Sequence, residues 1–212
     1  MQHTFYTIMN KIFNIKLIDK EFFNRNKKLL LIAFIIVFGS MILASVMGYF
    51  EAGDSYGEMT KIIEFAHENN IQPTDMNITS NDKSGLFYFI HNFIIDIMTM
   101  IGGVLFSIPS IISVWSSSQM AGHFIGKDFI FGLVATVPYG IIENLGSVFA
   151  LTIAFIITRR EIRIIKTRSF DGIKTDLKDI LILFLLDLIF IAVAGFIEAY
   201  VTPGIVSAVF GI

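Results

Sequence analysis

The sequence predicts an all-α protein that crosses a membrane about five times, with some helices broken or kinked and the N-terminus inside. Hydrophobic residues make up 54% of its 212 residues, and charged residues make up 16%, well below the roughly 25% of soluble domains. The apolar residues gather in runs of the roughly 20 residues that a helix needs to cross a bilayer. The formal net charge is only −2, but basic and acidic residues concentrate in different connecting segments, and this distribution sets the orientation.

The segment before the first apolar run is basic. Residues 1–28 carry six Lys/Arg and two acidic residues, and Phe5, Ile8, Ile12 and Ile15 recur at helical spacing. This pattern predicts an amphipathic helix that lies on the inner membrane surface, with a frayed basic tail as the alternative.

The first expected span covers residues 29–50, whose 22 residues match a crossing helix better than the shorter core of a cleaved leader. Residues 51–85 follow with seven acidic residues and two Lys, so we expect an external loop. The loop should hold one short helix, which begins at a capping box from Ser55 to Glu58. An apolar stripe at helical spacing would dock this helix, and its members are Met59, Ile62, Ile63 and Ala66.

Three apolar blocks make up most of the remaining chain. They cover residues 86–126, 129–158 and 180–200, and the last of them is one expected span. An internal basic loop, 159–178, precedes that span with seven Lys/Arg and three acidic residues. The short apolar tail, 204–212, cannot cross a bilayer by itself.

The number of crossings follows from the charges. Both basic segments should face the inside and the acidic loop the outside, so an odd number of crossings must separate residue 86 from residue 158. Two spans near 86–106 and 107–125, followed by a third in the next block, satisfy this rule. One long kinked helix followed by a re-entrant segment is the alternative. Several helix-breaking residues fit either arrangement, and these are Gly102, Gly103, Pro109, Pro138 and Gly140.

Polar residues lie within the apolar blocks, where a buried carboxylate costs at least about 2.5 kcal/mol. Asn92 and Asp96 are one helical turn apart and therefore share a helix face. Asp187 and Glu198 are three turns apart and share another. We expect both faces to point into the bundle, where small neighbours allow close packing. The alternative is that these groups, together with His91, Gln119, His123, Glu143 and Asn144, make ordinary structural hydrogen bonds or lie close to water.

The segment VPYGIIEN, Val137 to Asn144, combines a helix break with polar residues inside an apolar block. A proline inside a helix removes a backbone hydrogen bond, and the freed groups need partners. We therefore expect Glu143 and Asn144 to point into the bundle, with the Glu143 carboxylate accepting from freed backbone groups.

The residue content favours a non-enzymatic protein. The chain has no Cys, which excludes thiol catalysis, disulfides and Cys-ligated metals. It also lacks HExxH, GxSxG and phosphate-loop motifs. A metal site built on His91 and His123 together with acidic residues is the alternative. We expect no metal, no cofactor and no nucleic-acid partner.

Several of these segments resemble the stage II sporulation protein M family of membrane proteins. VPYGIIEN is similar to the family's Pro-His-Gly-x-x-Glu segment through Pro138, Gly140 and Glu143, with Tyr139 in place of the His. AGFIEAYVTP resembles the family's closing Glu-x-x-x-Thr-Pro pattern, through Glu198, Thr202 and Pro203.

Two further features extend the resemblance over residues 29–203. AGHFIG looks like an Asn-Gly-x-x-x-Gly segment through Gly122 and Gly126, with Ala121 in place of the Asn. Asn92 matches the family's Asn at the start of the second span. The resemblance implies a domain of about five helices. It also implies, from the family's named member, a membrane scaffold for peptidoglycan-degrading partners.

We therefore expect a multi-pass protein of the plasma membrane that acts as a scaffold or assembly factor for an envelope or cell-wall-remodelling complex. Its contacts would be the lipid bilayer and envelope proteins bound through the 51–85 loop, and a homo-oligomer is an open alternative. The competing hypothesis is a small solute or ion transporter that uses the intramembrane carboxylates.

Overall fold

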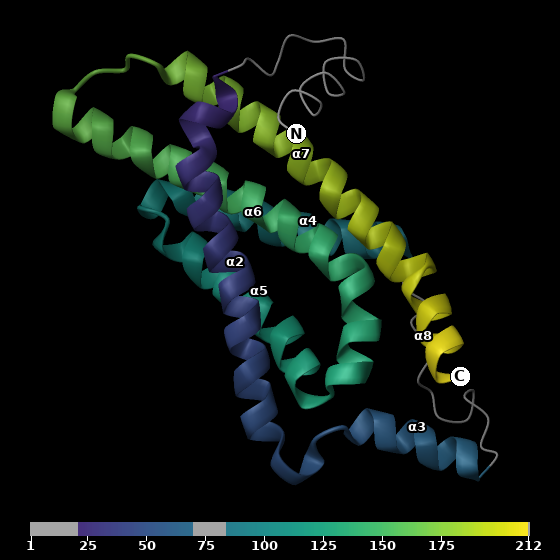
Figure 1. Cartoon of the computed structure of the whole chain (residues 1–212). Helices are drawn as coiled ribbons and strands as arrows, with labels where there is room; N and C mark the ends of the chain where they lie inside the picture. Colours follow the sequence, from purple (N-terminus) through teal and green to yellow (C-terminus); the bar gives the residue numbers. More distant parts are fainter. Residues whose placement is uncertain (1–20, 70–83, 212) are drawn as a thin grey trace.

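The computed structural model describes residues 21–69 and 84–211, so the amphipathic helix predicted in the first 20 residues lies outside it. Every regular element of the described part is helical, in agreement with the predicted fold class. Figure 1 shows the arrangement of these elements. They are α2 (Phe22–Ala52), η1 (Gly53–Ser55), α3 (Glu58–Glu68), α4 (Gly85–Ile101), η3 (Gly102–Leu105), α5 (Ile108–Lys127), α6 (Phe129–Thr167), α7 (Ile173–Tyr200) and α8 (Thr202–Phe210).

Four helical stretches of the described chain are long and apolar enough to cross a membrane. They are Phe22–Ser55, Gly85–Leu105, Phe129–Thr167 and Ile173–Tyr200. Helix α5 occupies the place of the fifth expected span, but it is more polar, because Ser116, Ser117, Ser118 and Gln119 lie together in it. By length and composition, the described residues thus supply four spans where about five were expected.

One end of the bundle, which we call the basic end, gathers the start of α2, the end of α6 and the start of α7. Arg25 Nη2 lies 2.7 Å from Asp179 Oδ1, and Arg159 Nη2 lies 3.0 Å from Asp176 Oδ1. The link between α4 and α5 reaches the same end of α6, where the hydroxyl groups of Ser107 and Thr158 are 2.6 Å apart.

The opposite end, which we call the acidic end, gathers the end of α2, helix α3 and the turn between α5 and α6. Gly57 N donates to Lys127 O at 2.9 Å, which joins the α2–α3 link to that turn. The start of α4 meets the end of α7, where Gly85 N donates to Tyr200 Oη at 3.4 Å.

Five helices therefore run alternately between the two ends, in the order α2, α4, α5, α6 and α7. Residues 86–126 form two helices, α4 and α5, and not the single kinked helix of the alternative. The chain reverses between them through the positive backbone φ angles of Phe106 and Ser107, 55° and 58°. Although α5 is more polar than its neighbours, it runs between the same two ends of the bundle.

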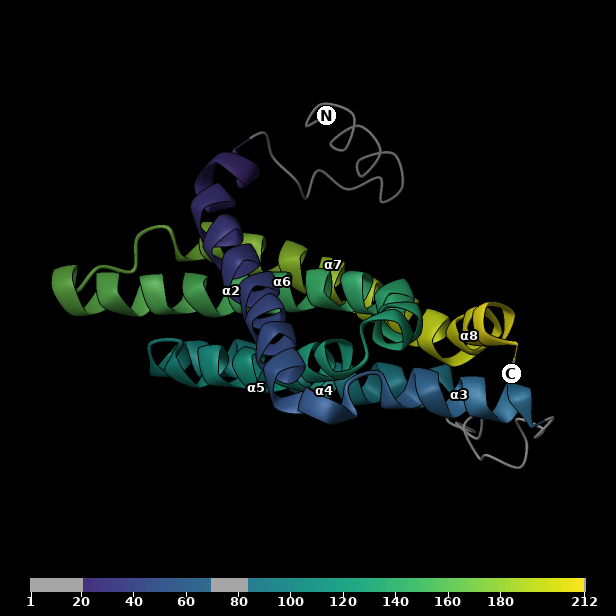
Figure 2. The ribbon, with the colours of Figure 1, turned by 60° about the horizontal axis from the view of Figure 1, so that its bottom comes forward.

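The five helices pack in two layers. Figure 2 shows α6 beside α7 in one layer and α4 and α5 in the other, with α2 crossing them. The core between α2, α6 and α7 is mostly aliphatic, and its members with exposed fractions of 3% or less include Leu151, Ile156, Ile182 and Leu183.

Helices α2 and α5 approach each other closely through glycines. A Cβ atom on Gly122 would lie 2.5 Å from Met41 O, and one on Gly48 would lie 2.7 Å from His123 O. A Cβ atom on Gly126 would overlap the Ser45 carbonyl oxygen. Contacts of this kind between small residues are the main way in which membrane helices associate, because lipid offers no hydrophobic driving force.

The basic segment 159–178 is mostly helical, which differs from the predicted loop. Helix α6 continues to Thr167 and α7 begins at Ile173, so the connection is short. The physical reason is the pairing of charges between the two helices. Asp176 binds both Arg159 and Arg160, and Arg160 also donates to the Asp171 carbonyl oxygen.

The acidic loop also differs in detail from the prediction. It holds one short helix as expected, α3, but Ser55 lies in η1 and does not cap it. Helix α3 instead follows Gly57, whose φ of 71° favours glycine. Of the predicted apolar stripe, Ile63 and Ala66 are buried, whereas Ile62 is exposed. The apolar tail forms the short helix α8.

Candidate functional site

Two carboxyl groups lie buried between α4, α6 and α7. Asp96 of α4 is 2% exposed and Asp187 of α7 is 0% exposed. Gly146 of α6 packs against both acids. A Cβ atom on this glycine would lie 3.1 Å from Asp187 Oδ1 and 3.7 Å from Asp96 Oδ2. The missing side chain lets three helices meet around two acids.

Few hydrogen bonds reach these carboxyl groups. Ser147 Oγ donates to Asp96 Oδ1 at 3.1 Å. Within the described residues, Asp96 Oδ2 and both oxygens of Asp187 accept no hydrogen bond, and no Lys, Arg or His lies within ion-pair distance of either acid. The two side chains are close enough to interact with each other. Because an ionised carboxylate only accepts hydrogen bonds, a bond between the two acids requires a shared proton.

A row of ionisable side chains leads from this pair toward the acidic end. Glu143 of α6 lies within electrostatic range of Asp96. Tyr139, one turn before Glu143, lies within range of both Glu143 and Glu198 of α7. Tyr88 of α4 in turn lies near Glu198. We call Tyr88, Glu198, Tyr139, Glu143, Asp96 and Asp187 the ionisable row.

The predicted interior faces of α4 and α7 are buried at Asp96 and Asp187, whereas Glu198 is half-buried. Asn92 is 7% exposed, one turn before Asp96, and its Nδ2 has no hydrogen-bond partner among the described residues. On α7, Ile191 and Ala194 are both 0% exposed and lie between the two predicted acids. The alternative of purely structural hydrogen bonds does not describe Asp187, which accepts none from residues 21–69 and 84–211.

The Pro–Gly segment bends α6 without ending it. The helix runs unbroken through Pro138 and Gly140, and Figure 1 shows it bent in its N-terminal half. At the bend, Asn144 Nδ2 donates to Gly140 O at 2.7 Å. Glu143, which was expected to accept from freed backbone groups, makes no hydrogen bond within the described residues and belongs to the ionisable row.

Other predicted residues lie elsewhere. Gly122 and Gly126 pack α5 against α2. Thr202 and Pro203 begin α8, where the Thr202 side chain is buried at 7% exposure. His123 Nε2 lies 2.8 Å from Glu51 Oε2 at the acidic end. His91 stacks on Phe87, with ring centroids 6.3 Å apart, and Gln119 is half-buried on α5.

The two His residues of the metal alternative have different surroundings. Within residues 21–69 and 84–211, no group of three or more His, Asp or Glu side chains suits a metal ion. His91 and His123 lie on different helices and have the separate neighbours described above.

Sequence reasoning missed Gly146 and Ser147, although a signal for Ser147 exists. Ser147 follows Glu143 by four residues and so occupies the same helix face. It also missed a buried polar cluster at the basic end. There Asp179, which is 0% exposed, binds Arg25 and accepts a hydrogen bond from Asn26 Nδ2 at 2.7 Å.

Comparison with known proteins gives a family and no closer relative. No curated protein and no solved structure matches the chain. The family described as stage II sporulation protein M matches residues 28–203, which is most of the chain and includes every member of the ionisable row. The chain therefore belongs to the stage II sporulation protein M family.

Proposed function

We propose that the protein is a non-enzymatic scaffold of the plasma membrane that holds an envelope protein at its acidic end. The observation that carries the proposal is the fixed position of α3. The helix lies outside the apolar stretches, yet it is held to the bundle by specific contacts. A partner would therefore meet a preformed surface, which lowers the entropy cost of binding.

Asp128, in the turn between α5 and α6, holds α3 in place. Its Oδ2 accepts from Thr60 N at 2.7 Å, and its Oδ1 accepts from Thr60 Oγ1 at 2.8 Å. The same side chain caps α6 by accepting from Phe131 N at 3.2 Å. Buried Ile63 and Ala66 add apolar contact. One carboxylate thus couples the outer helix to the longest helix of the bundle.

The opposite face of α3 is open and suits a partner that is basic with an apolar anchor. Phe65 is 59% exposed and Ile62 is 41% exposed. The acidic side chains from the end of α2 to the end of α3 are also exposed, and these are Glu51, Asp54, Glu58, Glu64 and Glu68. Lys61 and His67 are the basic side chains of α3. A pocket of about 350 Å³ lies where α3 begins, and Glu51, Glu58, Phe124 and Lys127 are among the residues that line it. By the positive-inside rule, we expect this end to face the outside of the cell.

The scaffold proposal predicts that charge on α3 controls recovery of a partner. A tagged chain is purified from native membranes in mild detergent, and the proteins that accompany it are identified by mass spectrometry. The double variant Glu64→Lys/Glu68→Lys should lose the partner by about tenfold or more, because two attractive charge contacts become repulsive.

Asp171→Lys is the matched control, since Asp171 is an exposed acid at the opposite end. This variant should leave recovery of the partner unchanged. The scaffold proposal would be contradicted if the double variant recovered as much partner as the wild type, or if the wild type were recovered without any partner.

A second candidate function is supported by the Asp96–Asp187 pair. Ionisable groups inside a membrane are costly and usually mark ion or proton pathways. We expect the pair to share one proton, and the ionisable row lies between the pair and the acidic end. Under this hypothesis the protein would be a proton- or cation-coupled carrier, and the bend of α6 would allow the interior to open.

The carrier hypothesis predicts proton flux that depends on Asp187. In proteoliposomes with an internal pH dye and an imposed potential, Asp187→Asn should lower the flux at least about tenfold, because an amide keeps the shape but cannot exchange the proton. Asp171→Asn should have no effect. Wild-type flux equal to that of protein-free liposomes, or equal flux in Asp187→Asn, would exclude a role for the pair in proton transport.

A further inference from the structure

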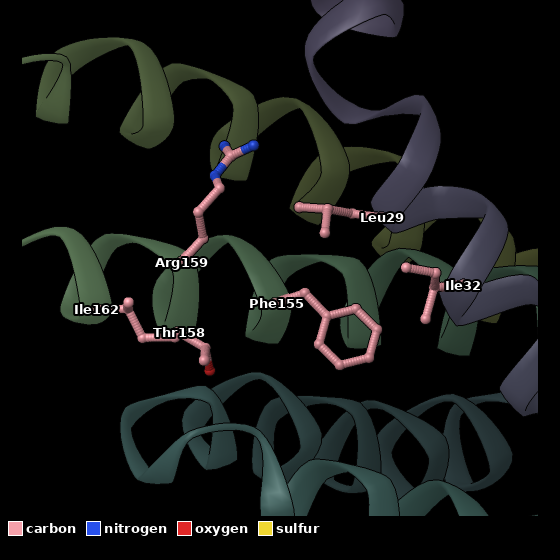
Figure 3. A pocket seen from close by; sticks show the side chains of 6 residues that line it. All are labelled: Leu29, Ile32, Phe155, Thr158, Arg159 and Ile162. Atoms are coloured by element: carbon pink, nitrogen blue, oxygen red, sulfur yellow. The ribbon is translucent and has the colours of Figure 1, made fainter.

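An apolar pocket of about 330 Å³ opens between α2 and α6 near the basic end. Leu29 and Ile32 enter it from α2, and Phe155, Thr158, Arg159 and Ile162 enter it from α6. Figure 3 shows the two α2 side chains facing Phe155, with Arg159 rising from α6 toward α7 at the rim. The volume is at the lower end of the roughly 300–1,000 Å³ of ligand pockets.

The polar groups of the pocket are not equally available. Thr158 is occupied, because its hydroxyl donates to Gly103 O at 2.8 Å and contacts Ser107 Oγ. The Arg159 side chain is 34% exposed and uses Nη2 to bind Asp176 Oδ1 at 3.0 Å. Asp176 also binds the buried Arg160 through its other oxygen. One carboxylate therefore faces two guanidinium groups, which leaves an excess positive charge at the rim.

The surroundings of the rim are basic as well. Segments 21–28 and 159–179 together contain ten Lys/Arg and five Asp/Glu. Both segments lie at the basic end, where the structure joins them through Arg25 and Asp179. Positive-inside orientation places this end at the inner leaflet, whose anionic lipids attract basic residues by about 1 kcal/mol each.

We propose that this pocket binds one anionic phospholipid of the inner leaflet. An acyl chain would fill the space between Leu29, Ile32 and Phe155, and the headgroup phosphate would lie at Arg159. Pocket and lipid are complementary, since the apolar walls suit a hydrocarbon chain and the unbalanced guanidinium suits a phosphate. A zwitterionic lipid would fill the walls equally well, but its own cation would oppose the basic rim.

The test uses the full-length protein, delipidated in neutral detergent. Phosphatidylglycerol or phosphatidylcholine with identical acyl chains is titrated in, and bound lipid is counted by native mass spectrometry. The wild type should prefer phosphatidylglycerol about fivefold, the size expected for one basic side chain at an anionic group. Arg159→Gln should abolish the preference while leaving weak binding of both lipids.

Two further variants make the result specific. Lys166→Gln removes an exposed cation of the same helix and should keep the fivefold preference. Ile162→Trp fills the pocket at a side chain that is 39% exposed, and it should reduce binding of both lipids. The proposal is overturned if the wild type binds both lipids equally, if Arg159→Gln keeps the preference, or if Lys166→Gln loses it to the same extent. Unchanged binding in Ile162→Trp would place the lipid outside this pocket.

Discussion

Replacing Gly126 with Val is expected to remove most of the folded protein. The added Cβ atom would overlap the Ser45 carbonyl oxygen and lie 2.8 Å from Tyr49 N, both of which are backbone atoms of α2. A flexible side chain could turn away from such a contact, but a helix backbone cannot, so the two helices must separate. Overpacking of this kind typically costs about 1–3 kcal/mol, and more when backbone is involved. The measurement is the yield of monodisperse protein in detergent and its melting temperature.

Gly39→Val is the matched control for that variant. Gly39 is also a helical glycine of α2, but a Cβ atom on it would meet nothing within 4 Å. Its yield and melting temperature should therefore stay close to those of the wild type. Equal behaviour of the two variants would mean that α2 and α5 do not pack through Gly126.

Asp179→Ala is expected to destabilise the basic end by about 3–5 kcal/mol, the cost of removing one partner of a buried ion pair. Asp179 is 0% exposed and accepts hydrogen bonds from Arg25 Nη2 at 2.7 Å, Arg25 Nε at 3.0 Å and Asn26 Nδ2 at 2.7 Å. Asn26 is also 0% exposed, so its amide would lose a partner that water could not replace.

The measurement for Asp179→Ala is the melting temperature in detergent. Asp171→Ala serves as the control, because Asp171 is an exposed acid of the same connection and its hydrogen bonds to Arg160 and Ser169 use only its backbone atoms. A melting temperature of Asp179→Ala within a degree or two of the control would contradict the buried network.

The sequence predicted the class of fold because hydrophobic length and charge position are physical requirements of a bilayer. Residues 29–50 and 180–200 are almost entirely apolar, and both lie within helices that could cross a membrane. The rule that basic segments share one side also required an odd number of passes in the middle of the chain. That rule favoured α4 and α5 as separate helices, although α5 itself is too polar to be recognised by composition alone.

Helix ends were less predictable, because they depend on contacts between distant segments. The composition of the basic segment predicts a loop. In the structure most of the segment is helical, and the ion pair between Arg160 of α6 and Asp176 of α7 joins the two helices. Ser55 and Glu58 have the spacing of a capping box, but Gly57 begins the helix and Asp128, 68 residues after Thr60, holds it. A local pattern cannot reveal a partner that tertiary packing supplies.

The site was predictable in part. The helical period and the spacing of the polar residues along the sequence were enough to place Asp96 and Asp187 on interior helix faces. Their meeting across Gly146 required the angle between α4, α6 and α7, which no spacing within one helix contains. For the same reason, the hydrogen bond from Asn144 to Gly140 O, and the lack of one at Glu143 within the described residues, depend on backbone geometry rather than on residue type.

The central claim, that α3 presents a fixed surface to an envelope protein, is tested most directly by photocrosslinking in native membranes. A benzophenone amino acid replaces Phe65 in one variant, and in a second variant it replaces Met120, which is 79% exposed on α5. We expect one reproducible protein adduct from the Phe65 position and none of the same mass from the Met120 position. The scaffold proposal would be contradicted if position 65 gave no adduct, or if positions 65 and 120 gave the same adduct. The carrier hypothesis, which rests on the buried carboxyl pair, would then be favoured.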